Sequence, residues 1–369
     1  MMTSTGPLDA AALRERVQTV LDTFLARQDD ALASVSPDLA PLMETVTSLL
    51  RGGKRLRSAF CYWGWRGATG SDGEDSVDAA APADDDHIVQ VAAAMEMFQA
   101  AALLHDDVMD GSATRRGRPA AHRRLAELHR SQGWLGSSDA FGIAGAILAG
   151  DLCLSWSDEM YTGSGLADSL LARGRGVFDQ MRTELMAGQY LDMFEQVQAS
   201  TTVARARHVI RYKSAQYTVE QPLLLGGSLG GAAPELLASY RAFGLPLGEA
   251  FQLRDDVLGV FGDPGETGKP AGDDLREGKR TALVAAALDA ADPGQAATVR
   301  RLLGDPGLDA SGVAELQQLI VDTGALDRIE GLIATRLSDA LDALAKAPVA
   351  SSAADVLAEL ALAATARVG

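Results

Sequence analysis

Apolar side chains recur at three- and four-residue spacing along nearly the whole chain. One stripe runs through residues 13–25, a second through 88–103 and a third through 319–341. This spacing places the apolar residues on one face of an α-helix. No run of alternating apolar and polar residues with hairpin turns accompanies it, so a large sheet is not expected. The pattern predicts an all-α protein.

The breaks between these stripes are rich in Gly, Pro and acidic residues. Residues 70–87 are expected to form a flexible acidic loop, in which the run Asp84–Asp86 with His87 is interpreted as solvated rather than metal-binding. Residues 111–120 and 262–274 are Gly/Pro-rich loops, and each follows an acidic helix end. Residues 1–10 are expected to be disordered. Because no linker or repeat divides the chain, residues 1–369 are predicted to form one domain.

Composition narrows the choice of partners. A hydrophobic content of 47 % supports a large core, and the net charge of −17 disfavours nucleic acid and anionic membranes. Cys61 and Cys153 have no metal-ligand spacing and are expected to be reduced and buried. The first residues lack a basic region followed by an apolar run, and no uncharged apolar stretch reaches eighteen residues. A cytoplasmic protein without a spanning helix is therefore expected.

The first acidic motif, DDVMD, ends an apolar helical run. Asp106, Asp107 and Asp110 stand three and four residues apart, a spacing that predicts three carboxylates on one side of a helix. Two carboxylates ~5 Å apart repel by roughly 3 kcal/mol at an effective dielectric of ~20. Such an arrangement in a cleft requires a cation, and magnesium takes oxygen ligands while keeping waters and substrate phosphates. The alternative is a solvated helix end, which the preceding apolar run MEMFQAAALLH disfavours.

A second motif, DDVLG, repeats this pattern at Asp255–Gly259. Gln252 precedes Asp255 and Asp256 on the same expected helical side, and a Gly-rich basic loop follows, as it does after the first motif. Two such pairs are difficult to explain as chance. They predict two metal platforms that face each other.

Basic residues cluster around both motifs in a chain that is otherwise acidic. Arg offers a planar fork for phosphate oxygens and Lys a compact charge, while neighbouring glycines let the backbone approach a ligand. These clusters therefore predict phosphate binding. They are RGGKRLR with Arg51, Lys54, Arg55 and Arg57; Arg115, Arg116 and Arg118; Lys213; and Lys269 with Lys279.

At this point the sequence resembles the trans-isoprenyl (polyprenyl) diphosphate synthase family, and in particular geranylgeranyl diphosphate synthases. The matching segments are GGKRLR at 52–57, LLHDDVMDGSATRRGRPAAH at 103–122, YKSAQ at 212–216 and FQLRDDVLGVFGDPGETGKPAGDDLREGKRTAL at 251–283. The resemblance implies a helical bundle around a deep central cavity, usually as a homodimer. It also implies head-to-tail condensation of isopentenyl diphosphate with dimethylallyl, geranyl or farnesyl diphosphate.

The resemblance carries residue roles with it. Magnesium, three ions per site, would be held by Asp106, Asp107, Asp110 and Asp255, with Asp256 holding metal-bound waters or orienting Lys269. The allylic diphosphate would contact Arg115, Lys213 and Lys269. Isopentenyl diphosphate would be bound by Lys54, Arg57 and Arg116, with Gln99 in place of the histidine of many relatives. Gln252 and Lys279 would also bind substrate.

Two positions depart from the family pattern. Gly259 stands where relatives commonly have a third aspartate, and Asp263, one turn further on, is a candidate substitute through water. Ser58 stands where proline usually follows GGKRLR. Neither change removes one of the expected main ligands.

The implied mechanism begins with stabilisation of the departing diphosphate by magnesium and the nearby cations. The alkene of isopentenyl diphosphate attacks the resulting allylic cation, and a proton is lost. The released diphosphate is the expected base. His105 beside Asp106 is the alternative, but it is expected to be a packed or orienting residue.

Product length in the family depends on the bulk below the first motif. Ala101 and Ala102 are small and would leave the pocket open, whereas Met97 and Phe98 one turn deeper could form its floor. Geranylgeranyl diphosphate is the expected main product, with longer polyprenyl or farnesyl diphosphate as alternatives. All four residues could also be ordinary core residues.

Three other functions fit these motifs less well. A class I terpene cyclase should lack GGKRLR because it binds no second diphosphate. A non-catalytic partner subunit should have lost its acidic ligands, and here only position 259 has changed. A plain helical scaffold leaves the acidic pairs and basic clusters unexplained.

Overall fold

The computed structural model describes residues 10–70, 85–198, 202–263, 265 and 271–366. Nearly all of these residues are helical, and the two short strands pair antiparallel as a small hairpin. This confirms the all-α prediction. In chain order the elements are α1 (Ala10–Val35), η1 (Pro37–Leu39), α2 (Ala40–Leu50), α3 (Leu56–Thr69), α4 (Asp85–Met109), β1 (Thr114–Arg115), β2 (Arg118–Pro119), α5 (Ala121–Ser131), α6 (Ser138–Thr162), α7 (Asp168–Val197), α8 (Val203–Ile210), η2 (Arg211–Glu220), α9 (Gln221–Leu229), α10 (Pro234–Phe261), α12 (Asp273–Glu277), α13 (Ala282–Ala290), α14 (Pro293–Leu302), α15 (Ala310–Asp322), α16 (Ala325–Ala345) and α17 (Ser351–Thr365).

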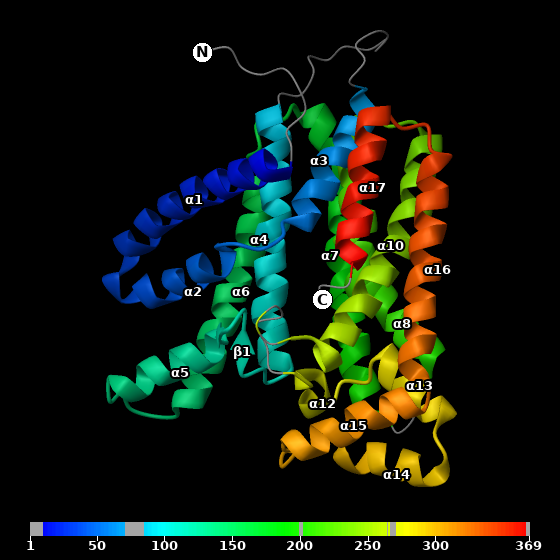
Figure 1. Ribbon diagram of the computed structural model, residues 1–369. Coiled ribbons are helices and arrows are strands. Elements are labelled where there is room, and N and C mark those ends of the chain that lie inside the picture. Colours follow the sequence, from blue (N-terminus) through cyan, green and yellow to red (C-terminus); the bar gives the residue numbers. More distant parts are fainter. Residues whose placement is uncertain (1–9, 71–84, 199–201, 264, 266–270, 367–369) are drawn as a thin grey trace.

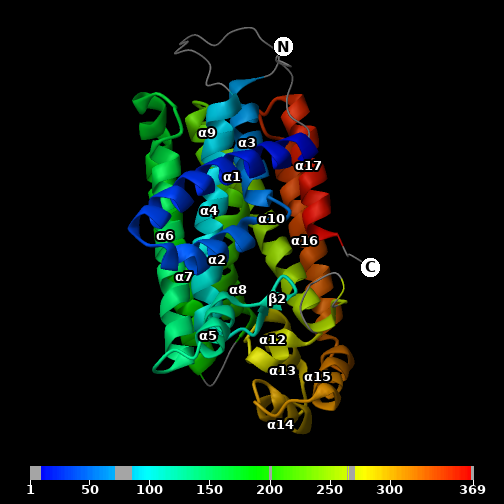
Figure 2. The same ribbon diagram turned by 90° about the vertical axis from the view of Figure 1, so that its left-hand side faces the viewer.

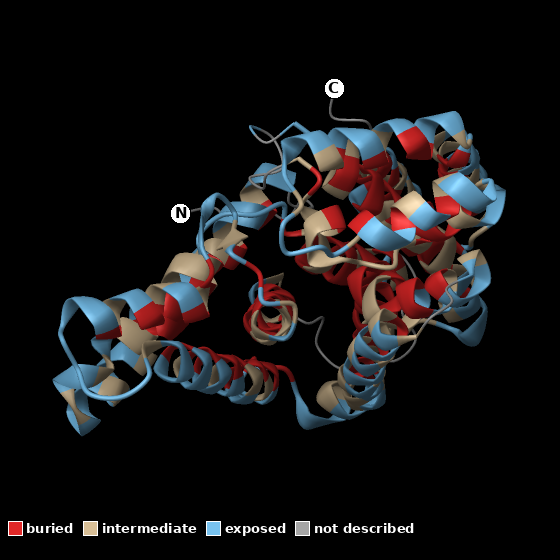
Figure 3. Ribbon diagram, turned by 90° about the horizontal axis from the view of Figure 1, so that it is seen from below, coloured by how far each residue is buried: buried red, intermediate tan, exposed pale blue. Residues whose placement is uncertain are grey.

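Helix α4 runs through the middle of the bundle. It packs against α6, α3 and α1, while α10, α16 and α17 stand on the far side of α3 and α12–α15 close one end (Figures 1 and 2). Seen from that end, the buried residues of each helix face the interior and the exposed residues face outward (Figure 3). This is the amphipathic pattern that the three- and four-residue spacing predicts.

The core has two parts. One cluster gathers around α1, α3, α4 and α9, and the other joins α10, α13, α15 and α16. Helix α4 is buried along most of its length because Ala, Val, Met and Leu fill its turns between Ile88 and Leu104. The DDVMD motif lies at the C-terminal end of this buried rod, and DDVLG lies near the end of α10.

The start of α4 corrects one prediction. The structure places Asp85, Asp86 and His87 in the first helical turn rather than in a loop, while residues 71–84 lie outside the described part. Tyr62 donates a hydrogen bond to Asp85 at 3.1 Å, and Arg16 pairs with Asp86. Acidic side chains stabilise a helix N-terminus. Asp85 and Asp86 therefore belong to a helix start. Of residues 1–10 only Ala10 is described, also as helix.

Two helices, α4 and α6, are long and apolar enough to cross a membrane by length and composition. Each apolar stretch contains an acidic residue, Glu96 in α4 and Asp151 in α6. The most apolar part of α4 is 72 % buried inside the protein and that of α6 is 39 % buried. Burial explains the composition of α4, whereas α6 keeps an exposed apolar face.

Candidate active site

A cavity of about 570 Å³ opens between α4, α7, η2, α10 and the segment that follows α12. Most of the residues that the sequence singled out as functional line it. They are Lys54, Arg57, Gln99, Ala102, Asp106, Arg115, Lys213, Gln252, Asp255, Asp256 and Lys279. Asp107, Asp110, Arg116, Met97, Phe98 and Ala101 do not line this cavity, and Lys269 lies outside the described residues.

The carboxylates of the first motif, DDVMD, point in different directions. Asp106 faces the cavity and pairs with Lys213 at 3.0 Å, whereas Asp107 is only 2 % exposed and accepts a hydrogen bond from Arg115 at 2.9 Å. Asp110 lies 3.2 Å from Lys279. The helix therefore does not present all three carboxylates to one side, because neighbouring residues are turned about 100° apart. The structure gives Asp107 the position of a residue that orients Arg115.

Burial and neighbouring charges shift the pKa values of Asp106 and Asp110, the other two carboxyls of the motif. Burial favours the neutral form of Asp106, but the charges of Lys213 and two further cations lower its pKa to about 2. Burial raises the pKa of Asp110, and the negative charge of Asp106 raises it further. Two carboxyls one turn apart thus differ in their affinity for a proton, which is the expected result when two negative charges share one site.

The second motif brings Asp255 and Asp256 to the same cavity from α10. Gln252 donates a hydrogen bond to Asp256 at 2.9 Å, and burial raises the pKa of Asp256 well above its usual range. Arg254 points away and bonds Glu330 of α16 through its two terminal nitrogens, Nη1 at 2.6 Å and Nη2 at 2.8 Å. This largely buried pair fixes the rotation of α10 and so directs the two aspartates toward the cavity.

Lys213 lies on a wider helical turn than its neighbours. Residues 211–220 form a π-helix, a form often found at functional sites. Its backbone packs against Gly188 of α7 so closely that a Cβ there would lie 2.6 Å from the Tyr212 carbonyl carbon. Lys213 reaches Asp106 on α4 and also Asp192 on α7, the latter at 2.7 Å. It is therefore held between two helices at the wall of the cavity.

Helix α7 supplies residues that the sequence analysis missed. Gln189, Asp192 and Glu195 line the cavity at three-residue spacing. Their only signal in the sequence is the polar stripe in GQYLDMFEQ, which follows no glycine-rich loop. Asp192 is the most informative of them, because it shares Lys213 with the first motif.

The basic residues of the GGKRLR segment meet the cavity at another part of its wall. Arg57 donates a hydrogen bond to Thr218 at 2.8 Å and lies over the ring of Tyr217, 4.2 Å from its centroid. The Tyr217 hydroxyl donates to Gln99. These contacts fix Arg57 and Gln99 next to one another, with Lys54 close by on the same wall.

Arg116 faces a different space. Its guanidinium donates to the backbone oxygens of Leu49 at 2.8 Å and Arg51 at 3.4 Å, and it borders a smaller cavity of about 190 Å³. It still lies against the GGKRLR loop, 3.1 Å from where a Cβ on Gly53 would be. Arg55 and Arg116 are the non-glycine residues with positive φ in the described part of the chain. Such strained positions concentrate at functional loops.

A buried ion pair anchors the GGKRLR loop to α4. Arg55 donates to Glu96 at 3.0 Å, and both side chains are less than 8 % exposed. Ser58 also donates to Glu96, through its hydroxyl at 3.0 Å and its backbone N–H at 3.4 Å. The serine that departs from the family pattern thus contributes two donors that proline could not supply.

Replacing Glu96 by alanine is expected to lower the free energy of unfolding by about 3–5 kcal/mol, because it leaves the buried Arg55 charge without its carboxylate. Urea unfolding followed by circular dichroism measures this loss. Glu159→Ala is the control, since it breaks the exposed pair with Arg27 and should cost less than about 1 kcal/mol. Equal losses in the two variants would contradict the role of the buried pair.

The donor set suits magnesium that is shared with a phosphate ligand. Both carboxylate oxygens of Asp110 are buried without a hydrogen bond, and Oδ2 is paired only by charge with Lys279 at 3.2 Å among the described residues. Within the described residues, no three His, Cys, Asp or Glu side chains gather closely enough to hold an ion by themselves. Magnesium uses one or two carboxylates and completes its shell with waters and phosphate oxygens. The oxygen donors present fit that mode of binding.

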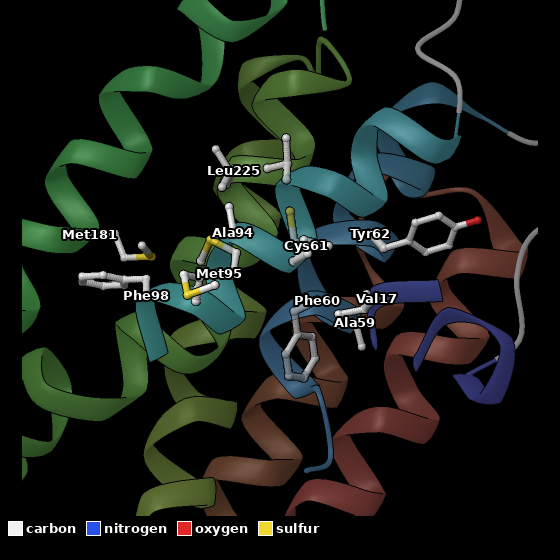
Figure 4. Packing of buried hydrophobic residues seen from close by; sticks show 14 of the residues in the cluster. Val17, Ala59, Phe60, Cys61, Tyr62, Ala94, Met95, Phe98, Met181 and Leu225 are labelled. Atoms are coloured by element: carbon white, nitrogen blue, oxygen red, sulfur yellow. The ribbon is translucent and has the colours of Figure 1, made fainter. Parts of the chain in front are cut away.

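The residues expected to set the cavity floor lie behind its wall. Ala102 lines the cavity, but Met97, Phe98 and Ala101 are at most 2 % exposed and lie deeper in α4. Phe98 meets Tyr217 edge to face, with ring centroids 5.5 Å apart. Figure 4 shows Phe98 directed away from α3, on the side of the cluster where Met181 lies. Phe98 therefore supports Tyr217, which does line the cavity.

Comparison with known proteins agrees with this geometry. Residues 40–320 match the family described as polyprenyl synthetase. Geranylfarnesyl diphosphate synthase of Aeropyrum pernix is 31 % identical over 84 % of this chain and 89 % of that protein. Geranylgeranyl diphosphate synthase of Mycobacterium tuberculosis is 32 % identical over 78 % of this chain and 72 % of that protein.

Solved structures extend the likeness to the whole fold. A crystal structure of geranylgeranyl pyrophosphate synthase from Corynebacterium glutamicum, complexed with isoprenyl diphosphate and magnesium, has a TM-score of 0.92 and 37 % identity. The match covers 98 % of this chain and 100 % of that one. Together with the acidic and basic walls of the cavity, these matches confirm the predicted fold and reaction class: the chain is a trans-prenyltransferase that belongs to the polyprenyl synthetase family.

Proposed function

We propose that this prenyl diphosphate synthase condenses isopentenyl diphosphate head to tail with an allylic diphosphate and that its main product is geranylgeranyl diphosphate. One observation supports the proposal that the enzyme binds two diphosphate substrates. The cavity has two separate groups of cations, Lys213 with Arg115 beside the carboxylates and Arg57 with Lys54 on another part of the wall. Each group suits one diphosphate.

In this proposal Asp106, Asp110 and Asp255 hold the ions, three per site, and Asp107 acts through Arg115. When bound, magnesium supplies positive charge that stabilises the departing diphosphate. Lys213 and Arg115 neutralise the same oxygens from the protein side. Lys54, Arg57 and Gln99 position isopentenyl diphosphate so that its alkene meets the allylic cation, and Lys269 stays a prediction for the allylic site.

The proton acceptor is the released diphosphate in this scheme. His105 lies 3.2 Å from the Ile147 carbonyl and 3.4 Å from Asp151, both on α6. Its ring fills the space beside Gly150 on α6, and it does not line the cavity. These contacts turn the ring toward α6 and not toward the cavity, which supports the expectation that His105 is a packed residue.

Incubation with labelled isopentenyl diphosphate, magnesium and each allylic primer in turn tests the proposed reaction. Products that are dephosphorylated and sized by mass should be geranylgeraniol for every primer shorter than geranylgeranyl diphosphate. Consumption of an allylic diphosphate without isopentenyl diphosphate would instead indicate a cyclase. A dominant C15 or C30 product would contradict the proposed chain length.

Shortening Phe98 or Met97 to alanine is expected to lengthen the product by one or more isoprene units, because the resemblance places both below the first motif and Phe98 packs against Tyr217 of the cavity wall. Product mass at fixed substrate ratio measures the effect. Phe24→Ala and Met160→Ala are matched controls, since these residues pack between α1 and α6 beside a separate cavity. Unchanged product length in both Phe98→Ala and Met97→Ala would exclude these residues as the floor.

A homodimer is part of the proposal. Helix α6 exposes Phe141, Ile147 and Leu148, the last at 57 %, and α7 exposes Met186 and Tyr190. This apolar face is larger than isolated surface residues would produce, and such faces mark association sites. We also propose that the whole chain is one catalytic domain and that the protein is cytoplasmic.

Leu148→Asp is expected to convert the homodimer to a monomer because it places a charge in the apolar α6 face. Sedimentation velocity at micromolar concentration measures the change. Leu362→Asp, on α17, is the matched control because Leu362 is similarly exposed at 53 %. A wild-type protein that sediments as a monomer would contradict the proposed dimer.

A further inference from the structure

Two arginines from the basic clusters of the sequence have no part in the proposed reaction. Arg51 and Arg118 do not line the catalytic cavity. Both line the smaller cavity of about 190 Å³, which lies between the ends of α2 and α4, the β1–β2 hairpin and α5. None of the side chains that the proposed function assigns to isopentenyl diphosphate lines this small cavity. Its basic lining therefore has another cause.

The small cavity gathers positive charge that the protein does not neutralise. Its lining arginines are Arg51, Arg115, Arg116, Arg118 and Arg124. Within the described residues, Arg115 pairs with the carboxylates of Asp106 and Asp107, and the other four arginines pair with none. In a protein with a net charge of −17, four unpaired arginines around one cavity predict a bound anion.

The β1–β2 hairpin places two of these arginines directly opposite each other. Arg115 of β1 and Arg118 of β2 are partners in the antiparallel register. The two residues between them, Arg116 and Gly117, have φ of 52° and 71°, as in a tight two-residue hairpin turn. Like charges directly opposite on neighbouring strands destabilise the pairing. An anion bound between the two side chains would offset that repulsion.

The wall formed by α2 and α5 holds a third arginine by neutral groups. Arg124 donates hydrogen bonds to Ser48 Oγ at 2.8 Å and to Thr45 Oγ1 at 3.0 Å. These hydroxyls in turn donate to backbone oxygens of Pro41 and Thr45, at 2.8 and 3.1 Å. A guanidinium has five donor N–H groups, so Arg124 keeps donors for a ligand. It is fixed in position without losing its charge to a carboxylate.

Arg116 is affected by the same crowding of charge. Burial lowers the pKa of its guanidinium, and the positive charges of Arg55 and Arg115 lower it further. Its hydrogen bonds go to the backbone oxygens of Leu49 and Arg51, which carry no full charge. A nearby anion favours the charged form of such a group. Arg116 therefore also fits an anion in the small cavity.

Arg115 connects this small cavity with the catalytic one, because it lines both. Its guanidinium donates to Asp107 at 2.9 Å and lies 3.5 Å from Asp106 of the catalytic cavity. An anion in the small cavity would draw on the same positive charge that the proposed function gives to the allylic diphosphate. Binding in one cavity should therefore weaken binding in the other, and this effect is reciprocal.

We propose that the small cavity is a second, non-catalytic phosphate site, which takes inorganic phosphate or pyrophosphate and inhibits the enzyme through Arg115 when it is occupied. Both ligands carry the phosphate oxygens that guanidinium groups bind in pairs. Pyrophosphate is the by-product of the proposed condensation. The inhibitory role rests on the proposed function, whereas the binding site does not.

Isothermal titration calorimetry of the full chain, without divalent metal, measures binding of inorganic phosphate and, separately, of pyrophosphate. Arg118→Gln should weaken phosphate binding about 10-fold, because a hydrogen bond to a charged group is lost. Arg124→Lys should also weaken it, since an ammonium replaces the planar fork. Arg123→Gln is the matched control, because Arg123 neighbours Arg124 on α5 but does not line the cavity. Circular dichroism verifies that each variant folds.

Steady-state rates measure the inhibition. Inorganic phosphate should raise the KM of the wild type for the allylic diphosphate, and Arg118→Gln should need about 10-fold more phosphate for the same rise. Without phosphate, this variant should turn over as the wild type does. Pyrophosphate also binds at the catalytic cavity, so only the inhibition that Arg118→Gln removes belongs to the small cavity. The ligand that loses more inhibition in Arg118→Gln is the one that the site prefers.

The possible results separate the site from its role. Weaker phosphate binding and weaker inhibition in Arg118→Gln and Arg124→Lys, with Arg123→Gln unchanged, support the proposal. Wild-type phosphate affinity in both variants, or an equal loss in the control, overturns it. Lost binding with unchanged inhibition overturns the coupling through Arg115. A wild type that binds phosphate in this way but forms no prenyl product would overturn the proposed function and the inhibitory role, and leave the site in place.

Discussion

Asp106→Asn is expected to lower kcat by roughly 10²-fold or more, because it removes an oxygen charge from the wall that binds the departing diphosphate. Asp106 faces the cavity, and the nearby cations lower the pKa of its carboxyl to about 2 against the effect of burial, so it is ionised near neutral pH. Steady-state rates with saturating magnesium and both substrates measure the effect.

The same loss is expected for Asp255→Asn on the opposite motif. Asp139→Asn serves as the control, because that side chain is 71 % exposed at the start of α6. Near-normal kcat in both Asp106→Asn and Asp255→Asn would remove metal-assisted departure of diphosphate from the mechanism. A loss in only one of them would show that the two motifs contribute unequally.

Lys213→Met is expected to lower kcat about 10²-fold, because it removes a preorganised positive charge from the site where negative charge develops. Lys213 also separates two carboxylates, at 3.0 Å from Asp106 and 2.7 Å from Asp192. The change therefore combines a lost contact to substrate with a new repulsion inside the protein. Rates for the single variant alone would not distinguish these causes.

The double variant Lys213→Met/Asp192→Asn separates them. Asparagine at 192 removes the repulsion without restoring a cation, so the double variant should stay close to the single one. Recovery of wild-type kcat would contradict a direct action of Lys213 on diphosphate and make it a counter-ion only. Lys346→Met, near the end of α16, is the matched control for loss of a lysine.

The features of this protein that could be predicted depend on patterns within short stretches of sequence. Helical periodicity predicted an all-α protein, the family resemblance predicted the bundle around a cavity, and the acidic and basic motifs indicated which segments meet there. Local spacing could not predict which carboxylate of DDVMD faces the cavity, because Asp106 and Asp107 differ by one step around the helix and Arg115 decides the outcome. The orientation of these carboxylates therefore depends on the β1–β2 hairpin, which follows the motif and carries Arg115.

The cavity residues that could not be predicted from the sequence have a different explanation. Gln189, Asp192 and Glu195 come from α7, which is remote in sequence from both acidic motifs. Their segment does not look catalytic by itself. Only the packing of α7 against η2 brings it to the site. The acidic start of α4 was misread for a simpler reason, because helix N-termini and solvated loops share a composition.

The π-helix that carries Lys213 has a consequence for how such a site can change. Pairs of residues at 209/210, 213/214 and 217/218 all reach the cavity, a four-residue repeat that would drift by about 40° per step around a regular α-helix. The wider turns keep the pairs in line. Deleting Ala215 or Gln216 would tighten the helix and rotate Tyr217 and Thr218 away while leaving Val209 and Ile210 in place. Losing one of these two codons would uncouple the two proposed diphosphate sites without altering any charged side chain.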